Sequence, residues 1–263
     1  MPARVSAPID HLVAAARESF YKNLLDIGGS TMVIVPTADP TYGALTAATF
    51  KTMGEAAITA TPNVALSAFT NPVGTQGVMP YVDFAGSGNS ISVAADAATE
   101  NVFDGGGVAG AWVYCRGDGG GSTGRIYNRN GANQLYVKSE SGGDVKVTFH
   151  QYWSGDDGVW STTARDLEMN TVKLVMVEYD SDATGNNAVI SIDNDDKSLT
   201  EDTTPVGTRT TGAGDPTIVG NLATSGTMRE WDGWISTFFT IDGTLTAAKR
   251  RAIYELGRGA FNY

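Results

Sequence analysis

The stretch EWDGWISTFFTIDGTLTAAKRRAIYELGRG, from Glu230 to Gly259, decides the fold. Within it, large apolar side chains occupy both the even and the odd positions of residues 234–241. A strand with apolar side chains on both faces lies between two layers rather than at a solvated edge of a sheet. The stretch therefore predicts a central strand of a layered β domain.

The second half of the same stretch predicts a short helix that closes this domain. After a Gly turn, Thr244 or Thr246 caps the helix start, and Gly257 or Gly259 ends the helix. One side of the helix is apolar and the other is basic. We expect it to cover an exposed end of the sheets, without a catalytic role.

Strand signals also dominate the rest of the chain from residue 78 onward. Eleven short strand-like segments alternate there with turns rich in Gly, Asn and Asp. This spacing predicts an antiparallel sandwich or jelly roll. The N-terminal part differs, with a long helical pattern at residues 8–27, a strand at 31–36 and a helical pattern at 45–58. We interpret the remainder of residues 30–77 as an extended arm.

Residues 78–258 resemble the laminin-G-like, concanavalin A-like jelly-roll domains of many bacterial and viral proteins. The resemblance rests on four blocks in the family's order: YVDFAGSGNSISVA (Tyr81–Ala94), VAGAWVYCR (Val108–Arg116), NTVKLVMVEYDSDATGNNAVISIDN (Asn170–Asn194) and the closing strand and helix that begin at Trp231. It implies a mainly β fold, an antiparallel jelly-roll sandwich with an N-terminal helix and extended arm and a short C-terminal helix. We predict a docking region at residues 1–77 and the jelly roll at residues 78–263.

Composition excludes several classes of function. The formal net charge of −11 argues against a nucleic-acid partner, because phosphate binding needs clustered Lys and Arg. The single cysteine, Cys115, excludes an intrachain disulfide and fits a strand interior. No apolar run has the length of about 18 residues that a membrane span needs. The N-terminus shows no signal peptide, so we expect synthesis in the cytoplasm unless a leader has been removed.

The search for catalytic groups finds little, and we predict that the protein is not an enzyme. His11 and His150 lie in unrelated contexts, and neither a Gly-x-Ser-x-Gly elbow nor zinc-type spacing is present. The resemblance implies a comparison with glucanases of this fold, whose carboxylates alternate as Glu-x-Asp-x-x-Glu. Glu178 and Asp180 match that motif, but its last position is Ala183.

Binding of calcium or of sugar is the alternative chemistry. Three acidic turns offer hard oxygen ligands for calcium, although none matches an EF-hand and we assign no ligands: 156–157, 180–182 and 193–196. No other cofactor is expected. A sugar needs an aromatic platform with polar neighbours, and HQYWSGDDGVW supplies Tyr152, Trp153 and Trp160 beside acidic residues. Tryptophans are equally common in sandwich cores.

These observations lead to three hypotheses about function. The first is a phage virion protein of the capsid, fibre or tail, made in the host cytoplasm. It would dock onto other subunits, or onto itself as a trimer, through residues 1–77, and bind host-surface glycans through the jelly roll. The second is a carbohydrate-binding module or lectin, with or without calcium. The third is a glycan-cleaving enzyme, which Glu178 and Asp180 would serve.

Overall fold

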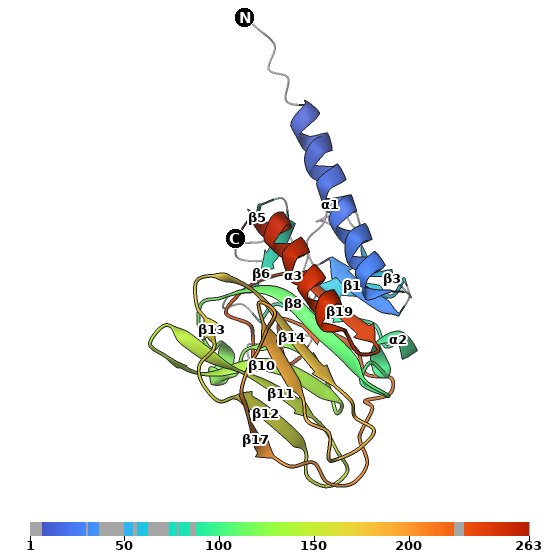
Figure 1. Cartoon of the computed structure of the whole chain (residues 1–263), viewed down its shortest axis with the longest axis vertical. Helices are drawn as coiled ribbons and strands as arrows, with labels where there is room; N and C mark the ends of the chain where they lie inside the picture. The colour runs from blue at the N-terminus through green and yellow to red at the C-terminus, as the bar shows by residue number, and fades with distance from the viewer. Residues whose placement is uncertain are drawn as a thin grey trace, which may run out of the picture.

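The computed structural model describes residues 7–29, 31–36, 50–54, 57–62, 74–77, 79–84, 88–223 and 229–262. In these ranges the chain is mainly β, and two antiparallel sheets face each other in a sandwich (Figure 1). Helix α1 (Ala7–Gly28) precedes the sheets and α3 (Ala247–Phe261) follows them, while α2 (Ala97–Glu100) is a single turn. The predicted fold class is confirmed.

Sheet A is built around the strand that the opening stretch predicts, β19 (Gly233–Asp242), which pairs with β8 on one side and β1 on the other. Its main path is, in spatial order, β16 (Asp195–Asp196), β15 (Val189–Ile192), β14 (Val172–Tyr179), β8 (Gly107–Cys115), β19, β1 (Met32–Pro36) and β3 (Met53–Gly54). Two further strands complete sheet A: β6 (Met79–Asp83) pairs with β19, and β5 (Gly74–Gln76) pairs with β6.

Sheet B lies opposite and follows a similar antiparallel path. Its spatial order is β17 (Leu199–Thr203), β12 (Gly158–Thr162), β11 (Asp144–Gln151), β10 (Asn133–Ser141), β9 (Arg125–Arg129), β18 (Thr217–Val219), β7 (Ile91–Val93), β4 (Thr59–Pro62) and β2 (Phe50–Lys51). The short β13 (Leu167–Glu168) pairs with β11. A 3-10 turn at Gly120–Ser122 precedes β9.

The space between the sheets holds the larger hydrophobic core. Its members come from alternate positions of both sheets, including Val113 and Phe238 from sheet A and Val147 and Phe149 from sheet B. Cys115 lies in this core at the end of β8, as the alternation of its segment predicts, and burial raises the pKa of its thiol to about 12. The thiol is therefore protonated at neutral pH.

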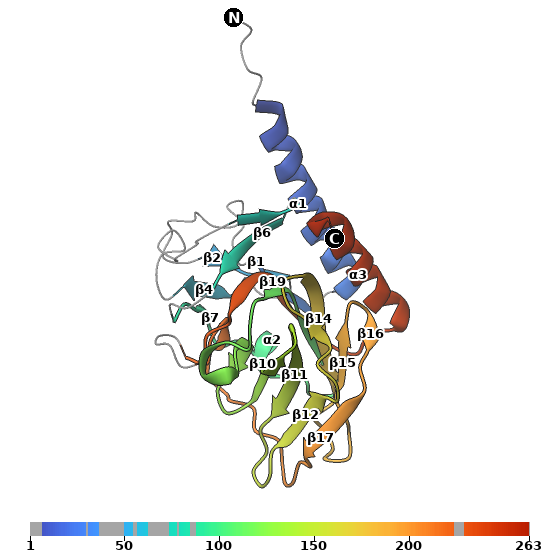
Figure 2. The same ribbon diagram turned by 90° about the vertical axis from the view of Figure 1, so that its left-hand side faces the viewer.

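A second core lies on the outer face of sheet A, under α1 and α3. Trp112 of β8 is fully buried there, and its ring centroid lies 5.3 Å from that of Phe20 on α1 and 5.6 Å from that of Phe261 on α3. Figure 2 shows both helices on this side of the sandwich. Sheet A is thus apolar on both faces, as the opening stretch predicts for its central strand.

The start of α3 follows the predicted chemistry, but its end does not. Thr246 is the N-cap, and its hydroxyl oxygen accepts a hydrogen bond from the Lys249 amide at 3.3 Å. The helix continues past Gly257 and Gly259 and ends at Asn262, which adopts a left-handed backbone conformation. Gly257 has a different purpose, because it lies directly against the indole of Trp112.

The N-terminal part contributes strands to both sheets. The predicted strand at residues 31–36 is confirmed as β1. The helical pattern at residues 45–58 is wrong where the structure describes it, because β2 and β3 occupy that segment and pair with β4 and β1. A boundary at residue 78 would thus pass through both sheets. The remaining arm residues, 37–49 and 63–73, lie outside the described residues, and so does Val78. No helix in the described ranges has the length and apolar character to cross a bilayer.

We predict that Gly257→Ala destabilises the protein. An added methyl group would overlap the Trp112 indole, which is itself held between α1 and α3. Overpacking of this kind lowers the free energy of unfolding by about 1–3 kcal/mol. Chemical denaturation followed by tryptophan fluorescence measures the change.

Gly259→Ala is the matched control in the same helix. A methyl group at this position meets no atom within 4 Å, and the residue is exposed. Alanine is the better helix former by about 0.5–1 kcal/mol, so this variant should be as stable as the parent or more stable. Equal destabilisation by the two changes would contradict the packing of α3 on Trp112.

Candidate functional site

The structure separates the three predicted carbohydrate-binding residues. Alternation along β11, which ends at Gln151, places His150 and Tyr152 on the outer face of sheet B. Trp153 lies on the inner side and is 6% exposed, and Trp160 of β12 faces the core and is 1% exposed. Neighbouring residues of an extended chain point to opposite faces. The three rings therefore do not form one platform, and only Tyr152 stays a candidate on the outer surface.

Around Tyr152, the outer face of sheet B carries a set of polar and aromatic side chains that we call the polar face. In register across β9, β10 and β11, Asn128 lies opposite Gln134, and Gln134 lies opposite His150. In the next row Arg125 lies opposite Tyr136. Neither α1 nor α3 covers these strands (Figure 2). The polar face consists of Arg125, Asn128, Gln134, Tyr136, His150 and Tyr152.

Ring contacts and hydrogen bonds hold the polar face together. The Arg125 guanidinium lies over the Tyr136 ring, 4.1 Å from its centroid. The rings of His150 and Tyr152 are stacked at 4.2 Å, and the Gln134 amide nitrogen donates to the Tyr152 hydroxyl. The side chains of Tyr136, His150 and Tyr152 are half-buried, so part of each ring is accessible.

Three polar atoms of this face have no hydrogen-bond partner among the described residues: Asn128 Oδ1, Gln134 Oε1 and Arg125 Nε. Their side chains are deeply buried, with exposed fractions of 1%, 2% and 8%. An unsatisfied buried group of this kind costs about 1–3 kcal/mol, and native proteins leave few of them. Two acceptors and one charged donor thus lack partners together on this face.

Burial controls the charges on the polar face. It lowers the pKa of His150, an effect that the 2.9 Å hydrogen bond to Asp157 opposes, so the imidazole is neutral at neutral pH. Burial also raises the pKa of Tyr136 and of Tyr152, which keeps both hydroxyls protonated. The pKa of Arg125 falls to about 10 through burial, and the guanidinium stays cationic at neutral pH. The face therefore carries neutral rings and amides beside a cation.

The two carboxylates of the glucanase-like motif lie elsewhere. Glu178 and Asp180 line a hollow of about 310 Å³ on the sheet A side, next to Thr244 at the start of α3. Glu178 accepts a hydrogen bond from the Leu245 amide at 3.4 Å, and burial raises its pKa. Asp180 accepts one from the Asp182 amide at 2.9 Å. Both carboxylates thus bond to backbone at a strand end and a helix start.

The acidic turns considered for calcium use their carboxylates within the fold. Asp157 accepts a hydrogen bond from the Trp153 amide at 2.9 Å, and Asp193 accepts one from the Leu174 amide at 3.0 Å. Asp196 forms a 2.6 Å ion pair with Arg250. Within the described ranges, no three acidic, His or Cys side chains gather closely enough to hold a metal ion. Calcium binding by these turns stays a prediction.

Trp160 contributes to a second hollow, of about 450 Å³, at the open edge between the two sheets. Its indole nitrogen donates to the Asn187 side-chain oxygen at 3.2 Å. Val189, one of the few large exposed apolar residues, and charged side chains of β16 and β17 complete the lining. This hollow is separate from the polar face, because Trp160 points to the inner side of sheet B.

Sequence analysis missed four members of the polar face: Arg125, Asn128, Gln134 and Tyr136. A hairpin signal was present, since Asn130-Gly131 separates the segments RIYNR and NQLYVKSE. Pairing these segments across the turn places Tyr127 with Leu135 on one face and Asn128 with Gln134 on the other. The prediction relied instead on the concentration of aromatic residues in HQYWSGDDGVW, and such a concentration does not distinguish the two faces of a strand.

Comparison with known proteins shows the fold. No family model matches the chain, and no curated protein does. Among solved structures, the binding domain of botulinum neurotoxin serotype D matches with a TM-score of 0.56 and 11% identity over 78% of this chain and 48% of that chain. The binding domain of botulinum neurotoxin DC in complex with SialylT matches with 0.55 and 10% over 87% and 52%.

A third similar structure is the CBM40 of the Ruminococcus gnavus IT-sialidase bound to α2,3-sialyllactose, with a TM-score of 0.49 and 9% identity over 66% of this chain and 97% of that chain. The chain spans about half the length of the two toxin chains. At these identities the likeness is one of architecture, the two-sheet jelly roll.

We predict a large loss of stability on replacing the tryptophan of the HQYWSGDDGVW segment at position 160 and a small loss on replacing its tyrosine at position 152. Trp160→Ala should lower the free energy of unfolding by about 3–5 kcal/mol, because it empties a core position. Tyr152→Phe removes one hydrogen bond at a half-buried ring and should lower it by less than about 1.5 kcal/mol. Thermal unfolding of both variants tests the assignment of the two residues to opposite faces. A mild effect of Trp160→Ala would contradict it.

Proposed function

We propose that this protein is a non-catalytic carbohydrate-binding domain and that the polar face is its sugar site. The observation that carries this proposal is the set of unpartnered polar atoms on Arg125, Asn128 and Gln134, of which Arg125 lies over the Tyr136 ring and Gln134 bonds to the Tyr152 hydroxyl. A sugar presents hydroxyl donors and acceptors around its rim and an apolar face of C–H groups. The polar atoms match the rim, and the tyrosine rings match the face.

A protein partner would need a different surface. Interface centres are apolar and well packed, and their aromatic anchors are surrounded by other apolar groups. Among described residues, the large exposed apolar side chains are Val189 and Val206, and neither belongs to the polar face. Polar atoms under half-buried rings suit a small, hydroxyl-rich ligand better than a flat protein surface.

Similar folds support a binding role. Two of the similar structures with TM-scores above 0.5 are binding domains of botulinum neurotoxins, and one of them was solved in complex with SialylT. We extend the role of a binding domain to this chain as part of the proposal. Glu178 and Asp180 lie on the other side of the sandwich and bond to backbone amides, so a hydrolytic role for them is not part of it.

Ligand access requires a small movement in the polar face. The three unpartnered atoms are out of reach of water in this conformation. Tyr152 lies beside the Gln134 amide and is held by one hydrogen bond and one stacked ring. Rotation of the Tyr152 side chain breaks both of these contacts. We infer that a bound sugar replaces the tyrosine hydroxyl as partner of Gln134.

We predict that Tyr136→Ala and Tyr152→Ala each weaken sugar binding by about tenfold or more, since each removes an aromatic surface that packs on the ligand. The measurement is a glycan array with the purified full chain, followed by calorimetry on the glycans that bind. Circular dichroism verifies that both variants remain folded.

Tyr254→Ala is the matched control, because Tyr254 is also half-buried but lies on α3, on the far side of the sandwich. Its removal should leave glycan affinity within about twofold of the parent. Loss of binding in the Tyr254 variant, with none in the two polar-face variants, would refute the assignment of the site. Absence of binding to every glycan would refute the proposed function itself.

A second candidate function, a subunit of a virion, is favoured by the shape of α1. In both views the N-terminal part of this helix extends beyond the sandwich, and its C-terminal part packs beside α3 (Figures 1 and 2). A projecting helix is suited to association with a second copy of the chain or with another subunit. The jelly roll would then face outward as the glycan-binding part.

For this second candidate, we predict that the full chain is oligomeric and that a chain lacking residues 1–13 is monomeric. The truncation leaves the buried contacts of Phe20, Tyr21 and Leu24 in place, so the sandwich should keep its stability. Light scattering with size-exclusion chromatography gives both masses. Monomers in both cases would argue against assembly through α1.

A further inference from the structure

Arg125 of the polar face and the neighbouring Arg229 differ from most other arginines in the described chain because they form no ion pair. Six described arginines bond to carboxylates within 4 Å: Arg116, Arg129, Arg209, Arg250, Arg251 and Arg258. Arg125 and Arg229 have no carboxylate partner among the described residues. Arg165 has none either, but it is exposed and donates to the Ser139 carbonyl near the end of β10.

Arg125 and Arg229 converge on one residue. Arg125 Nη1 donates to the Thr123 carbonyl at 2.7 Å, and Arg229 Nη1 donates to the Thr123 hydroxyl. Their backbones are also adjacent, since the Arg125 amide donates to the Arg229 carbonyl at 3.0 Å. Arg229 Nη1 also donates to the Gly121 carbonyl at 3.0 Å. Two guanidinium groups therefore meet at Thr123, in a chain that carries 29 acidic residues.

This arrangement is electrostatically unfavourable without an anion. Arg125 is 8% exposed, and both burial and the charge of Arg229 lower its pKa. Unpaired charges are rare at such depth because water no longer solvates them. The guanidinium edge formed by Nε and Nη2 has no acceptor among the described residues. That edge has the fork geometry that binds a carboxylate through two hydrogen bonds.

The other unpartnered atoms of the polar face narrow the ligand class. Asn128 Oδ1 and Gln134 Oε1 are acceptors, so they need hydroxyl or amide donors, whereas Arg125 Nε needs an acceptor. A neutral sugar supplies the donors but not the charge. A simple anion such as phosphate dianion supplies the charge but not the donors. An acidic sugar has both, with hydroxyl groups and a carboxylate on one ring.

We propose that the polar face selects glycans that carry a carboxylate and that Arg125 and Arg229 bind this group together. The inference rests on the proposed function and specifies its ligand class. Tyr136, which lies against the Arg125 guanidinium at 4.1 Å, orients that group and leaves its Nε edge toward the ligand. The amides of Asn128 and Gln134 then accept hydrogen bonds from sugar hydroxyl groups.

The test compares acidic glycans with their neutral parents on the full chain. The probes are a panel of uronic-acid and sialic-acid glycans, each printed beside the same glycan with its carboxylate reduced to an alcohol. We expect Arg229→Gln to weaken binding of the carboxylated form by about tenfold or more and to leave binding of the reduced form unchanged. Arg229→Lys should restore only part of the affinity, because an ammonium group cannot form the fork.

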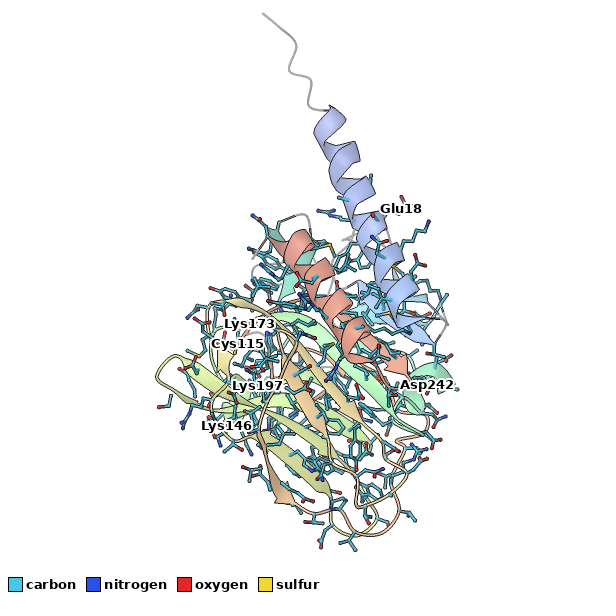
Figure 3. All side chains as sticks on the ribbon, in the orientation of Figure 1. Glu18, Cys115, Lys146, Lys173, Lys197 and Asp242 are labelled. Carbon is cyan, nitrogen blue, oxygen red and sulfur yellow. The ribbon has the colours of Figure 1, made fainter. Side chains whose placement is uncertain are left out.

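Lys146→Gln is the matched control for loss of one positive charge. Lys146 belongs to β11 and is half-buried on sheet B, outside the polar face, and Figure 3 shows it far from Glu18 on α1. This variant should keep the affinity for carboxylated glycans within about twofold, because Lys146 lies one row beyond Tyr136 and would act on the ligand only through a screened charge. If the Lys146 and Arg229 variants lose the same amount of affinity for carboxylated glycans, net charge alone explains the effect and the inference is wrong.

A second measurement observes Arg125 in the parent protein and does not require replacement of this deeply buried residue. The Arg125 Nε–H resonance in ¹⁵N NMR reports directly on the atom that lacks a partner. Titration of the parent protein with galacturonic acid should shift this resonance, and titration with galactose should not. Equal binding of carboxylated and reduced glycans would overturn the inference and keep the proposed function, whereas no binding of any glycan would end both.

Discussion

Sheet A has apolar side chains on both faces, and the rest of the structure depends on how both are buried. The inner face packs against sheet B, and the outer face packs under α1 and α3, with Trp112 between Phe20 and Phe261. Burial of the outer face removes the rings of Trp112 and Trp234 from water, which contributes about 25 cal/mol for each Å² of apolar surface. The helices are therefore part of the sandwich, and the part of the outer side of sheet A that they cover cannot serve as a binding surface while they remain in place.

Neither helix covers the outer face of sheet B, so only one face of this sheet has to be apolar. Its inner residues complete the core, and many of its outer residues, freed from that requirement, are polar, among them amides, hydroxyls, tyrosines, lysines, a histidine and an arginine. Some of these polar groups are satisfied within the sheet, as in the 2.9 Å contact between Thr148 and Ser161. Asn128, Gln134 and Arg125 each keep one atom without a partner. Such groups lower stability, and in the proposed function a ligand offsets this cost by supplying their missing partners.

Much of the fold follows from local sequence patterns, and the departures have identifiable physical causes. The strand at residues 233–242 and the Thr-capped helix depend on periodicity and capping, which act within a few residues. The strands β2 and β3 replace an expected helix because β4 and β1 provide ladder partners that no local propensity reveals. Gly257 lies within helix α3 and does not end it. The glycine is there because the helix packs on Trp112, and this contact leaves no room for a side chain. The site was harder to predict, because Arg125 and Arg229 are adjacent only through the pairing of distant segments.

The acidic character of the chain affects how such a site works. A net charge of −11 repels an acidic glycan at long range, while two guanidinium groups attract it at contact. Exposed charges separated by more than about 8 Å are largely screened at physiological salt, whereas a partly buried contact is screened much less. Long-range fields govern association rates, and buried charged contacts govern dissociation. An acidic glycan on the polar face would therefore bind no faster than its neutral parent and would be distinguished by a slower release. Selectivity of this kind arises from Arg125, Arg229 and the amides beside them, and it does not require the protein to be basic.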